Sequence, residues 1–365
     1  MKALPESDLK WMRQALALAR RGEGLTRPNP PVGAIVVKHG QKIGQGWHKQ
    51  AGGPHAEIFA LRQAGAAARG ATLYVTLEPC STFGRTPPCT TAIVRAGVAR
   101  VVVGTLDPNP QNGRKGVRAL RHAGVQAESG VCAPEAAELI APFACRLHRR
   151  RPFVALKLGL SVDGRIADFA HASRWITGPA ARAEVQAMRR AADAILVGAG
   201  TVRRDNPSLW PRPDKGRAPW RVVAVRRGPL PLAAQVFTDA HAARTIVAAP
   251  KGWQPALARK LRRQGVAVWT LPPKRLLSAL AAELGKLGIL RVLCEGGGIL
   301  AGELIRARLV DELNVFFSPV CVGGPVGAMG QTRWRLAEAP RFACREIRSI
   351  GADVFVRLVP QDRED

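Results

Sequence analysis

The chain lacks long hydrophobic runs, and no uninterrupted apolar stretch approaches 18 residues in its 365 positions. A helix needs about 20 such residues to span a bilayer, so no membrane segment is predicted. The first eight residues, MKALPESD, also lack the apolar core of a signal peptide. These absences predict a cytoplasmic protein with no membrane partner, and the length suits two domains.

Aromatic and acidic residues are also scarce. Phe, Trp and Tyr make up 5% of the chain, and 27 Asp+Glu stand against 55 Lys+Arg, which gives a net charge of +28. Residues 1–150 hold 21 Lys+Arg and 9 Asp+Glu, and the remainder holds 34 and 18, so the excess is spread along the chain. Nucleic-acid-binding proteins usually gather cations and aromatics on one face, so nucleic acid is not the favoured partner. A phosphorylated substrate also profits from a positive field.

The seven cysteines are odd in number and irregularly spaced, which argues against a disulfide framework. Two of them belong to a pattern, in which Pro-His55-Ala-Glu57 is followed by Pro-Cys80 and then by Cys89. One imidazole and two thiolates supply three ligands of a four-coordinate zinc ion and leave one position open for catalysis. Glu57 can approach that position without ligating and would move protons. A loop histidine with two core thiols is the alternative, but it does not explain the two motifs together.

The first half of the chain alternates short strands with helices. Pro54 suits the first turn of a helix, which places His55 and Glu57 at a helix start, and Cys89 opens the next helix. Alternating strands and helices predict a layered α/β domain. The expected elements are helices at 8–22, 54–61, 89–96 and 115–123, and strands at 32–37, 42–47, 71–78 and 100–106.

A basic run from Arg146 to Pro152 predicts a domain boundary, with a short nucleic-acid-binding arm as the alternative. The strand and helix rhythm continues beyond it. The expected strands are 153–158, 194–198, 221–225, 245–248, 266–270, 291–294, 313–318 and 354–358, and the expected helices are 179–191, 254–264, 274–287 and 299–306.

Two features of the second half point to a ligand. The segment RVLCEGGG, residues 291–298, is typical of a strand that runs into glycines and then a helix, where bare amides bind phosphate. A tight turn that needs glycine is the alternative. Lys157 lies on an otherwise apolar strand, which is costly without an anionic partner, so we place it near a reaction site. No GxGxxG motif opens the first helix of this half, so a standard dinucleotide fold is not predicted.

Zinc-dependent deaminases of nucleic acids and nucleosides have ligands of this type, usually with two residues between the cysteines. In this chain eight residues separate Cys80 from Cys89. The longer loop can reach over a substrate. Arg85 within it is suited to hold a phosphate or a carbonyl, although a solvated loop arginine is the alternative.

These motifs resemble those of one family, the bifunctional deaminase/reductase of riboflavin biosynthesis. They occur in the same order as in that family and cover nearly the whole chain. In the first half the resemblance lies in TRPNPPVG (26–33), AGGPHAE (51–57), TLEPC (76–80), GRTPPC (84–89) and DPNP (107–110). In the second half it lies in LKLGLSVDG (156–164), SRWIT (173–177), DNPSL (205–209) and CEGGG (294–298).

The resemblance implies an α/β fold with an N-terminal cytidine-deaminase-like three-layer domain at 1–148. It implies a C-terminal dihydrofolate-reductase-like domain at 149–365, with a mostly parallel sheet covered by helices on both faces. The implied reactions are zinc-assisted hydrolytic deamination of 2,5-diamino-6-(5-phosphoribosylamino)pyrimidin-4(3H)-one, and then NADPH reduction of the ribosyl group of 5-amino-6-(5-phosphoribosylamino)uracil to ribityl. The expected cofactors are Zn²⁺ and NADPH, and a homo-oligomer is expected.

Matching the family's motifs residue by residue also implies the site. In the deaminase domain, zinc binds His55, Cys80 and Cys89, Glu57 donates the proton, and the substrate pocket is lined by Asn29, His48, Arg85, Asp107 and Asn109. In the reductase domain, NADPH contacts Gly159, Trp175, Thr201, Asp205, Gly296, Gly297 and Gly298. Its substrate contacts Ser173, Arg189, Leu209, Arg212 and Glu295, and Lys157 joins this group on the argument above.

Two of these positions, and one position beside them, carry a qualification from the residues themselves. Trp175 also suits a hydrophobic core, and Arg189 also suits an exposed helix surface. Thr82 stands where the family often has His, so the chain departs from the pattern at one pocket contact.

Two other functions fit parts of the sequence. A nucleic-acid base deaminase with a basic accessory domain agrees with the charge, but not with the long cysteine gap or the Gly-rich second half. A non-enzymatic RNA-binding protein on a deaminase scaffold conflicts with the complete set of zinc ligands and Glu57.

Overall fold

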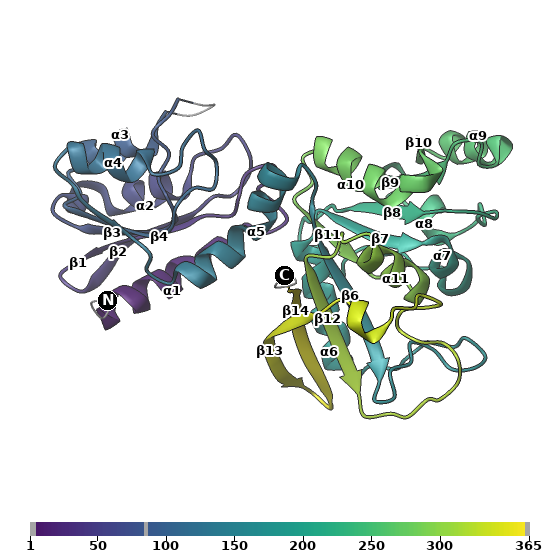
Figure 1. Ribbon diagram of the computed structural model, residues 1–365. Helices are drawn as coiled ribbons and strands as arrows, with labels where there is room; N and C mark the ends of the chain where they lie inside the picture. The colour runs from purple at the N-terminus through teal and green to yellow at the C-terminus, as the bar shows by residue number, and fades with distance from the viewer. Residues whose placement is uncertain (1–4, 84–86, 362–365) are drawn as a thin grey trace. The chain divides into compact units, whose positions relative to one another are not determined.

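The computed structural model describes residues 5–83 and 87–361. The chain divides into two compact units, Met1–Arg150 and Arg151–Asp365, each built on its own sheet (Figure 1). Within the described residues, none of the helices combines the length and the apolar character needed to cross a membrane.

The first unit has a five-stranded sheet in the order β2-β1-β3-β4-β5. β1 pairs antiparallel with β2 and β3, whereas β3, β4 and β5 are parallel. The strands are β1 (Gly33–Lys38), β2 (Gln41–Trp47), β3 (Thr72–Leu77), β4 (Arg100–Thr105) and β5 (Gln126–Ser129). The helices are α1 (Glu6–Arg20), α2 (Ala56–Ala64), α3 (Cys89–Arg95), α4 (Lys115–His122) and α5 (Ala133–Arg149).

Strand side chains alternate between two cores, as the two-residue period of a strand requires. On one face, Val36 and Val75 pack with α2, α3 and α4. On the other face, Ile35 and Tyr74 pack with α1 and α5. The sheet therefore lies between two helical layers, as Figure 1 shows, and the predicted three-layer domain is confirmed.

A buried charge cluster joins α1 to the sheet of this unit. Asp8 is 1% exposed and accepts a hydrogen bond of 2.6 Å from the Tyr74 hydroxyl. Arg100 donates two further bonds to the same carboxylate, at 3.0 and 2.6 Å. These partners satisfy the buried carboxylate, which would otherwise be costly to desolvate.

The second unit has a nine-stranded sheet in the order β10-β9-β8-β7-β11-β6-β12-β14-β13. All pairs are parallel except those that β14 makes with β12 and β13. The strands are β6 (Phe153–Ser161), β7 (Ala194–Gly198), β8 (Trp220–Ala224), β9 (Thr245–Pro250), β10 (Ala267–Leu271), β11 (Arg291–Cys294), β12 (Glu312–Ser318), β13 (Phe342–Ile350) and β14 (Asp353–Pro360). The helices are α6 (Pro179–Ala191), α7 (Ala199–Asp205), α8 (Gln235–Thr238), α9 (Pro255–Arg263), α10 (Leu276–Lys286) and α11 (Gly298–Arg306).

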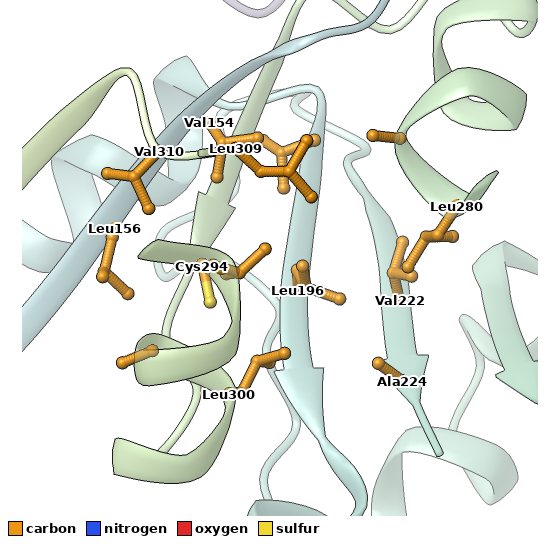
Figure 2. Close-up of a cluster of buried hydrophobic side chains, with 14 of the residues drawn as sticks. Val154, Leu156, Leu196, Val222, Ala224, Leu280, Cys294, Leu300, Leu309 and Val310 are labelled. Carbon is orange, nitrogen blue, oxygen red and sulfur yellow. The ribbon is translucent and has the colours of Figure 1, made fainter. Parts of the chain in front are cut away.

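Helices cover both faces of this sheet. Figure 2 shows one core, in which Leu196 and Val222 of the strands meet Leu280 of α10 and Leu300 of α11. The opposite face packs against α7, α8 and α9, and Phe316 and Phe355 pack there against α6. The predicted mostly parallel sheet with helices on both faces is confirmed.

Most predicted elements form within a few residues of their expected bounds, but five were missed. The basic run at 146–152 is not a free linker, because its first part is the last turn of α5. The sequence pattern does not predict α5, because Pro142 lies inside it and proline is normally unfavourable in a helix interior. β13 was missed because its side chains are partly or fully exposed, so it has no apolar face to reveal it. The shorter β5, α7 and α8 were also missed.

Candidate functional site

The three predicted zinc ligands come together in the first unit. His55 is the residue before α2, Cys80 follows β3, and Cys89 is the first residue of α3. Their ligand atoms all lie within 4.8 Å of one another. His55 Nδ1 lies 3.2 Å from Cys89 Sγ and 3.6 Å from Cys80 Sγ.

These separations suit zinc. With bonds of about 2.0 Å to nitrogen and about 2.3 Å to sulfur, a tetrahedral zinc ion holds such ligands about 3.5 Å apart. The two measured distances lie on either side of that value. A three-ligand set of this kind is typical of catalytic zinc, which keeps one position for a reactant.

The charges of the site also favour a cation. The Cys89 thiol and the His55 ring stabilise the thiolate of Cys80 and lower its pKa to about 4. The hydrogen bond with Cys80 and burial raise the pKa of Cys89. A divalent cation offsets the charge of the second thiolate, so both sulfurs can ligate.

Glu57 lies beside this triad and has the properties of a proton carrier. It is in the first turn of α2 and only 3% of its surface is exposed. Burial raises the pKa of its carboxyl group, which brings proton uptake closer to neutral pH. A carboxyl group that can hold a proton is what general acid–base catalysis needs.

Of two predicted pocket residues, His48 lies next to the triad and Asn29 lies against His48. The rings of His48 and His55 have their centroids 5.3 Å apart. His48 Nε2 lies 3.1 Å from the Asn29 amide nitrogen, and its Nδ1 lies 3.1 Å from the Pro54 carbonyl oxygen. With Nδ1 protonated, Nδ1 donates a hydrogen bond to the Pro54 carbonyl oxygen and Nε2 accepts one from the Asn29 amide. His48 is also only 2% exposed. This geometry leaves the Asn29 amide better placed than His48 to meet a substrate.

Two of the remaining predicted pocket residues share one loop. Asp107 and Asn109 follow β4, where the Asp107 carboxylate accepts the Asn109 N–H at 2.8 Å. Thr82 is exposed, and Arg85 lies outside the described residues. The substrate roles of these residues stay predictions.

Sequence reasoning gave no role to Glu78 or Asn112, which are 3% and 6% exposed. Glu78 accepts three backbone hydrogen bonds from the segment that carries Asp107. The available signal was a charged residue at the end of an otherwise apolar strand, a position that requires hydrogen-bond partners once buried.

In the second unit, the predicted NADPH contacts Thr201 and Gly296–Gly298 follow two neighbouring parallel strands, β7 and β11. β11 lies between β6 and β7, so the segments that leave these three strands meet at one edge of the sheet. The Glu295 N–H donates to the Leu196 carbonyl oxygen at 2.9 Å, which holds the two strand ends together. Ligands of open α/β sheets bind at such an edge, where the strand order reverses.

The glycines of this edge have different roles. A Cβ at Gly298 would lie 2.5 Å from the Gly327 carbonyl oxygen, so close packing explains this glycine. At Gly296 it would crowd Leu300 at 2.6 Å. No atom lies within 4 Å of a Cβ at Gly297, which is exposed and precedes α11. Gly297 is therefore the best candidate among the three for a close approach of phosphate.

Lys157, Arg189 and Glu295 form a charged group that is largely buried, since the Arg189 and Glu295 side chains are only 14% and 10% exposed. Arg189 donates from Nε and Nη2 to the Glu295 carboxylate at 2.6 and 2.9 Å. Among the described residues Lys157 forms no ion pair, and burial lowers its pKa although Glu295 opposes this at longer range. The Arg189 guanidinium, predicted to contact substrate, is thus paired with Glu295, and the helix-surface alternative for Arg189 is wrong because its side chain is only 14% exposed.

The other residues predicted to contact NADPH or substrate differ in how accessible they are to a ligand. Trp175 is 67% exposed, so the core alternative is wrong. The Arg182 guanidinium lies 4.7 Å from the centroid of its ring, and the rest of the side chain is accessible to a ligand. Leu209 is 2% exposed and packs in a core cluster, so only its backbone remains available to substrate. The other predicted contacts are themselves partly or fully exposed: Gly159, Ser173, Thr201, Asp205 and Arg212.

Replacement of His55 tests the metal site. We expect wild-type protein to retain about one zinc ion per chain, whereas His55→Ala retains much less because two sulfurs alone hold the ion weakly. Elemental analysis after gel filtration measures both. His122→Ala, an exposed histidine at the end of α4 in the same unit, is the matched control and should bind zinc normally. Equal zinc in the two variants would contradict the site.

Replacement of Glu295 tests the buried charged group. Glu295→Gln leaves the Arg189 guanidinium without its charged partner, and we expect the free energy of unfolding to fall by about 3–5 kcal/mol. Glu303→Gln is the control, because Glu303 pairs with an Arg226 side chain that is 67% exposed, and a loss below about 1 kcal/mol is expected. Urea unfolding of the full chain measures both values. Equal losses would rule out the buried pair.

Comparison with known proteins agrees with this division of the chain. Residues 5–105 match the cytidine and deoxycytidylate deaminase zinc-binding region, and residues 152–356 match the RibD C-terminal domain. Riboflavin biosynthesis protein RibD of Bacillus amyloliquefaciens is 40% identical over 360 residues, covering 97% of each chain.

Two solved structures are similar over nearly the whole chain. Acinetobacter baumannii RibD, form 1, is 39% identical with a TM-score of 0.86 and covers 98% of this chain and 99% of its own. A Thermotoga maritima diaminohydroxyphosphoribosylaminopyrimidine deaminase/5-amino-6-(5-phosphoribosylamino)uracil reductase is 36% identical with a TM-score of 0.87, covering 97% and 99%. Matches of this length do not favour a nucleic-acid base deaminase. The chain belongs to the riboflavin biosynthesis protein RibD family.

Proposed function

We propose that this chain carries out two consecutive steps of riboflavin biosynthesis. The first is hydrolytic deamination of 2,5-diamino-6-(5-phosphoribosylamino)pyrimidin-4(3H)-one. The second is reduction of the ribosyl group of 5-amino-6-(5-phosphoribosylamino)uracil to ribityl by NADPH. The observation that carries the proposal is the triad of His55, Cys80 and Cys89 with Glu57 beside it, in a chain that matches a deaminase/reductase over 97% of its length.

In the deamination, water replaces the 2-amino group of the pyrimidine and ammonia leaves. His55, Cys80 and Cys89 would hold the zinc ion, which would supply the Lewis acidity that activates the attacking water. Glu57 takes a proton from the attacking water and gives it to the departing amino group, so the carboxyl group ends as it began. Its burial suits this role, because a raised pKa lets the carboxyl group hold the proton between the two transfers.

The proposed substrate contacts surround this centre. The amide of Asn29 and the loop that carries Asp107 and Asn109 supply donors and acceptors for the polar edge of a pyrimidine. His48 supports the site by fixing the Asn29 amide, which lies 3.1 Å from it.

The reduction is assigned to the second unit. NADPH supplies a hydride to the ribosyl C1′, and the ring oxygen that leaves this carbon gains a proton. We place the cofactor along Gly159 near the end of β6, Thr201 in α7 directly after β7, and Gly297 after β11. Lys157 Nζ lies 3.5 Å from the position of a Cβ on Gly159, which puts a buried amine beside this edge.

The two activities are tested together by supplying the diamino substrate and NADPH to purified protein. Ammonia release and loss of the nicotinamide absorbance should both occur, and the second should require the first. Ammonia release from RNA or DNA, without a response to the pyrimidine phosphate, would overturn the proposal.

Glu57→Gln separates the two steps. We expect deamination to fall by about 10²–10⁴-fold, because the proton carrier is lost. Zinc content and NADPH oxidation on supplied deaminated substrate should stay at wild-type levels. Glu128→Gln, which alters a carboxylate of the same unit that is 47% exposed, is the control. Undiminished deamination in Glu57→Gln would remove Glu57 from the mechanism.

A further inference from the structure

Glu78 connects two segments of the deaminase site that are far apart in sequence. It lies two residues before Cys80 and is 3% exposed. Its Oε2 accepts the N–H groups of Asp107 at 3.1 Å and Arg114 at 2.8 Å, and its Oε1 accepts the N–H of Val117 at 3.0 Å. One carboxylate therefore holds both ends of residues 107–117.

The start of α4 depends on these bonds. The residue before the helix, Arg114, has φ +62° and provides no side-chain cap. Glu78 accepts hydrogen bonds from the N–H groups of Arg114 and Val117, so it caps α4 from the segment that follows β3. Close packing maintains the same contact, because a Cβ on Gly116 would lie 2.0 Å from the Pro79 carbonyl oxygen.

Asn112 makes a second connection on the other side of Cys80. Its Oδ1 accepts the Ser81 N–H at 3.2 Å, and its Nδ2 donates to Asp107 Oδ2 at 2.7 Å. The backbone around Cys80 is thus bonded through Glu78 before it and through Ser81 after it. Both connections lead to Asp107.

We propose that Glu78 is a positioning residue of the deaminase: its carboxylate sets the loop of Asp107 and Asn109 at a fixed place relative to Cys80. This inference rests on the proposed function, because Asp107 and Asn109 are assigned there to the substrate. Glu78 itself is not among the clustered zinc ligands, and its three backbone partners occupy both oxygens. Its effect is expected in substrate binding, with metal retention unchanged.

The test is Glu78→Gln in the full chain, assayed for deamination, reduction and zinc content. The amide nitrogen of glutamine must face at least one backbone N–H, so the loop shifts and the KM for the diamino substrate rises. We expect KM to rise about tenfold or more, because loss of a hydrogen bond to a charged group weakens binding by about this factor. The change in kcat should be smaller. Zinc content and the reductase KM should match the wild type.

Asp8→Asn is the matched control. Asp8 is also a buried carboxylate of the first unit with several hydrogen-bond donors, but it packs with α1 and the sheet away from Cys80. A merely structural role for Glu78 predicts that both variants lose stability and keep the wild-type KM. An unchanged KM in Glu78→Gln, an equal rise in Asp8→Asn, or loss of zinc in Glu78→Gln would each overturn the inference.

If Glu78→Gln does not fold, Asn112→Ala takes its place, because it cuts the second connection to Asp107. A raised KM with zinc retained supports the inference, and an unchanged KM overturns it. Absence of deamination in the wild-type protein would instead refute the proposed function, so the two failures are distinguishable.

Discussion

Two sulfurs and one ring nitrogen within 4.8 Å of one another constrain the whole first unit. Two neighbouring thiolates repel each other, so a cation must offset their charge if both are to ligate. The three residues come from a helix start, a strand end and a second helix start. The sheet and the helices on one of its faces are needed to bring them together.

Both units gather their polar chemistry where strands end. In the first unit, β3 leads to Glu78 and Cys80, and β4 leads to Asp107. In the second, β11 leads to Glu295 beside the end of β7. Apolar side chains fill most strand positions, with Lys157 of β6 as an exception, so most of the polar groups lie close together without disturbing the cores. The same principle thus serves the zinc-ligand triad in one unit and the proposed cofactor edge in the other.

Much of this arrangement could be predicted from sequence because its signals are local. His55 and Glu57 are two residues apart, and Pro54 marks the helix start that carries them. The run of glycines after β11 similarly marks a strand-to-helix turn. Long-range contacts could not be predicted in this way. The Arg189–Glu295 pair spans 106 residues, and the bonds of Glu78 span 29 to 39. Pro142 concealed α5, because a proline inside a helix resembles a helix end.

X-ray absorption spectroscopy at the zinc edge tests the central claim most directly. The account predicts two sulfur scatterers at about 2.3 Å and nitrogen or oxygen at about 2.0 Å around one zinc ion per chain. A zinc ion with only nitrogen and oxygen neighbours, or purified protein that neither holds nor takes up zinc, would contradict it.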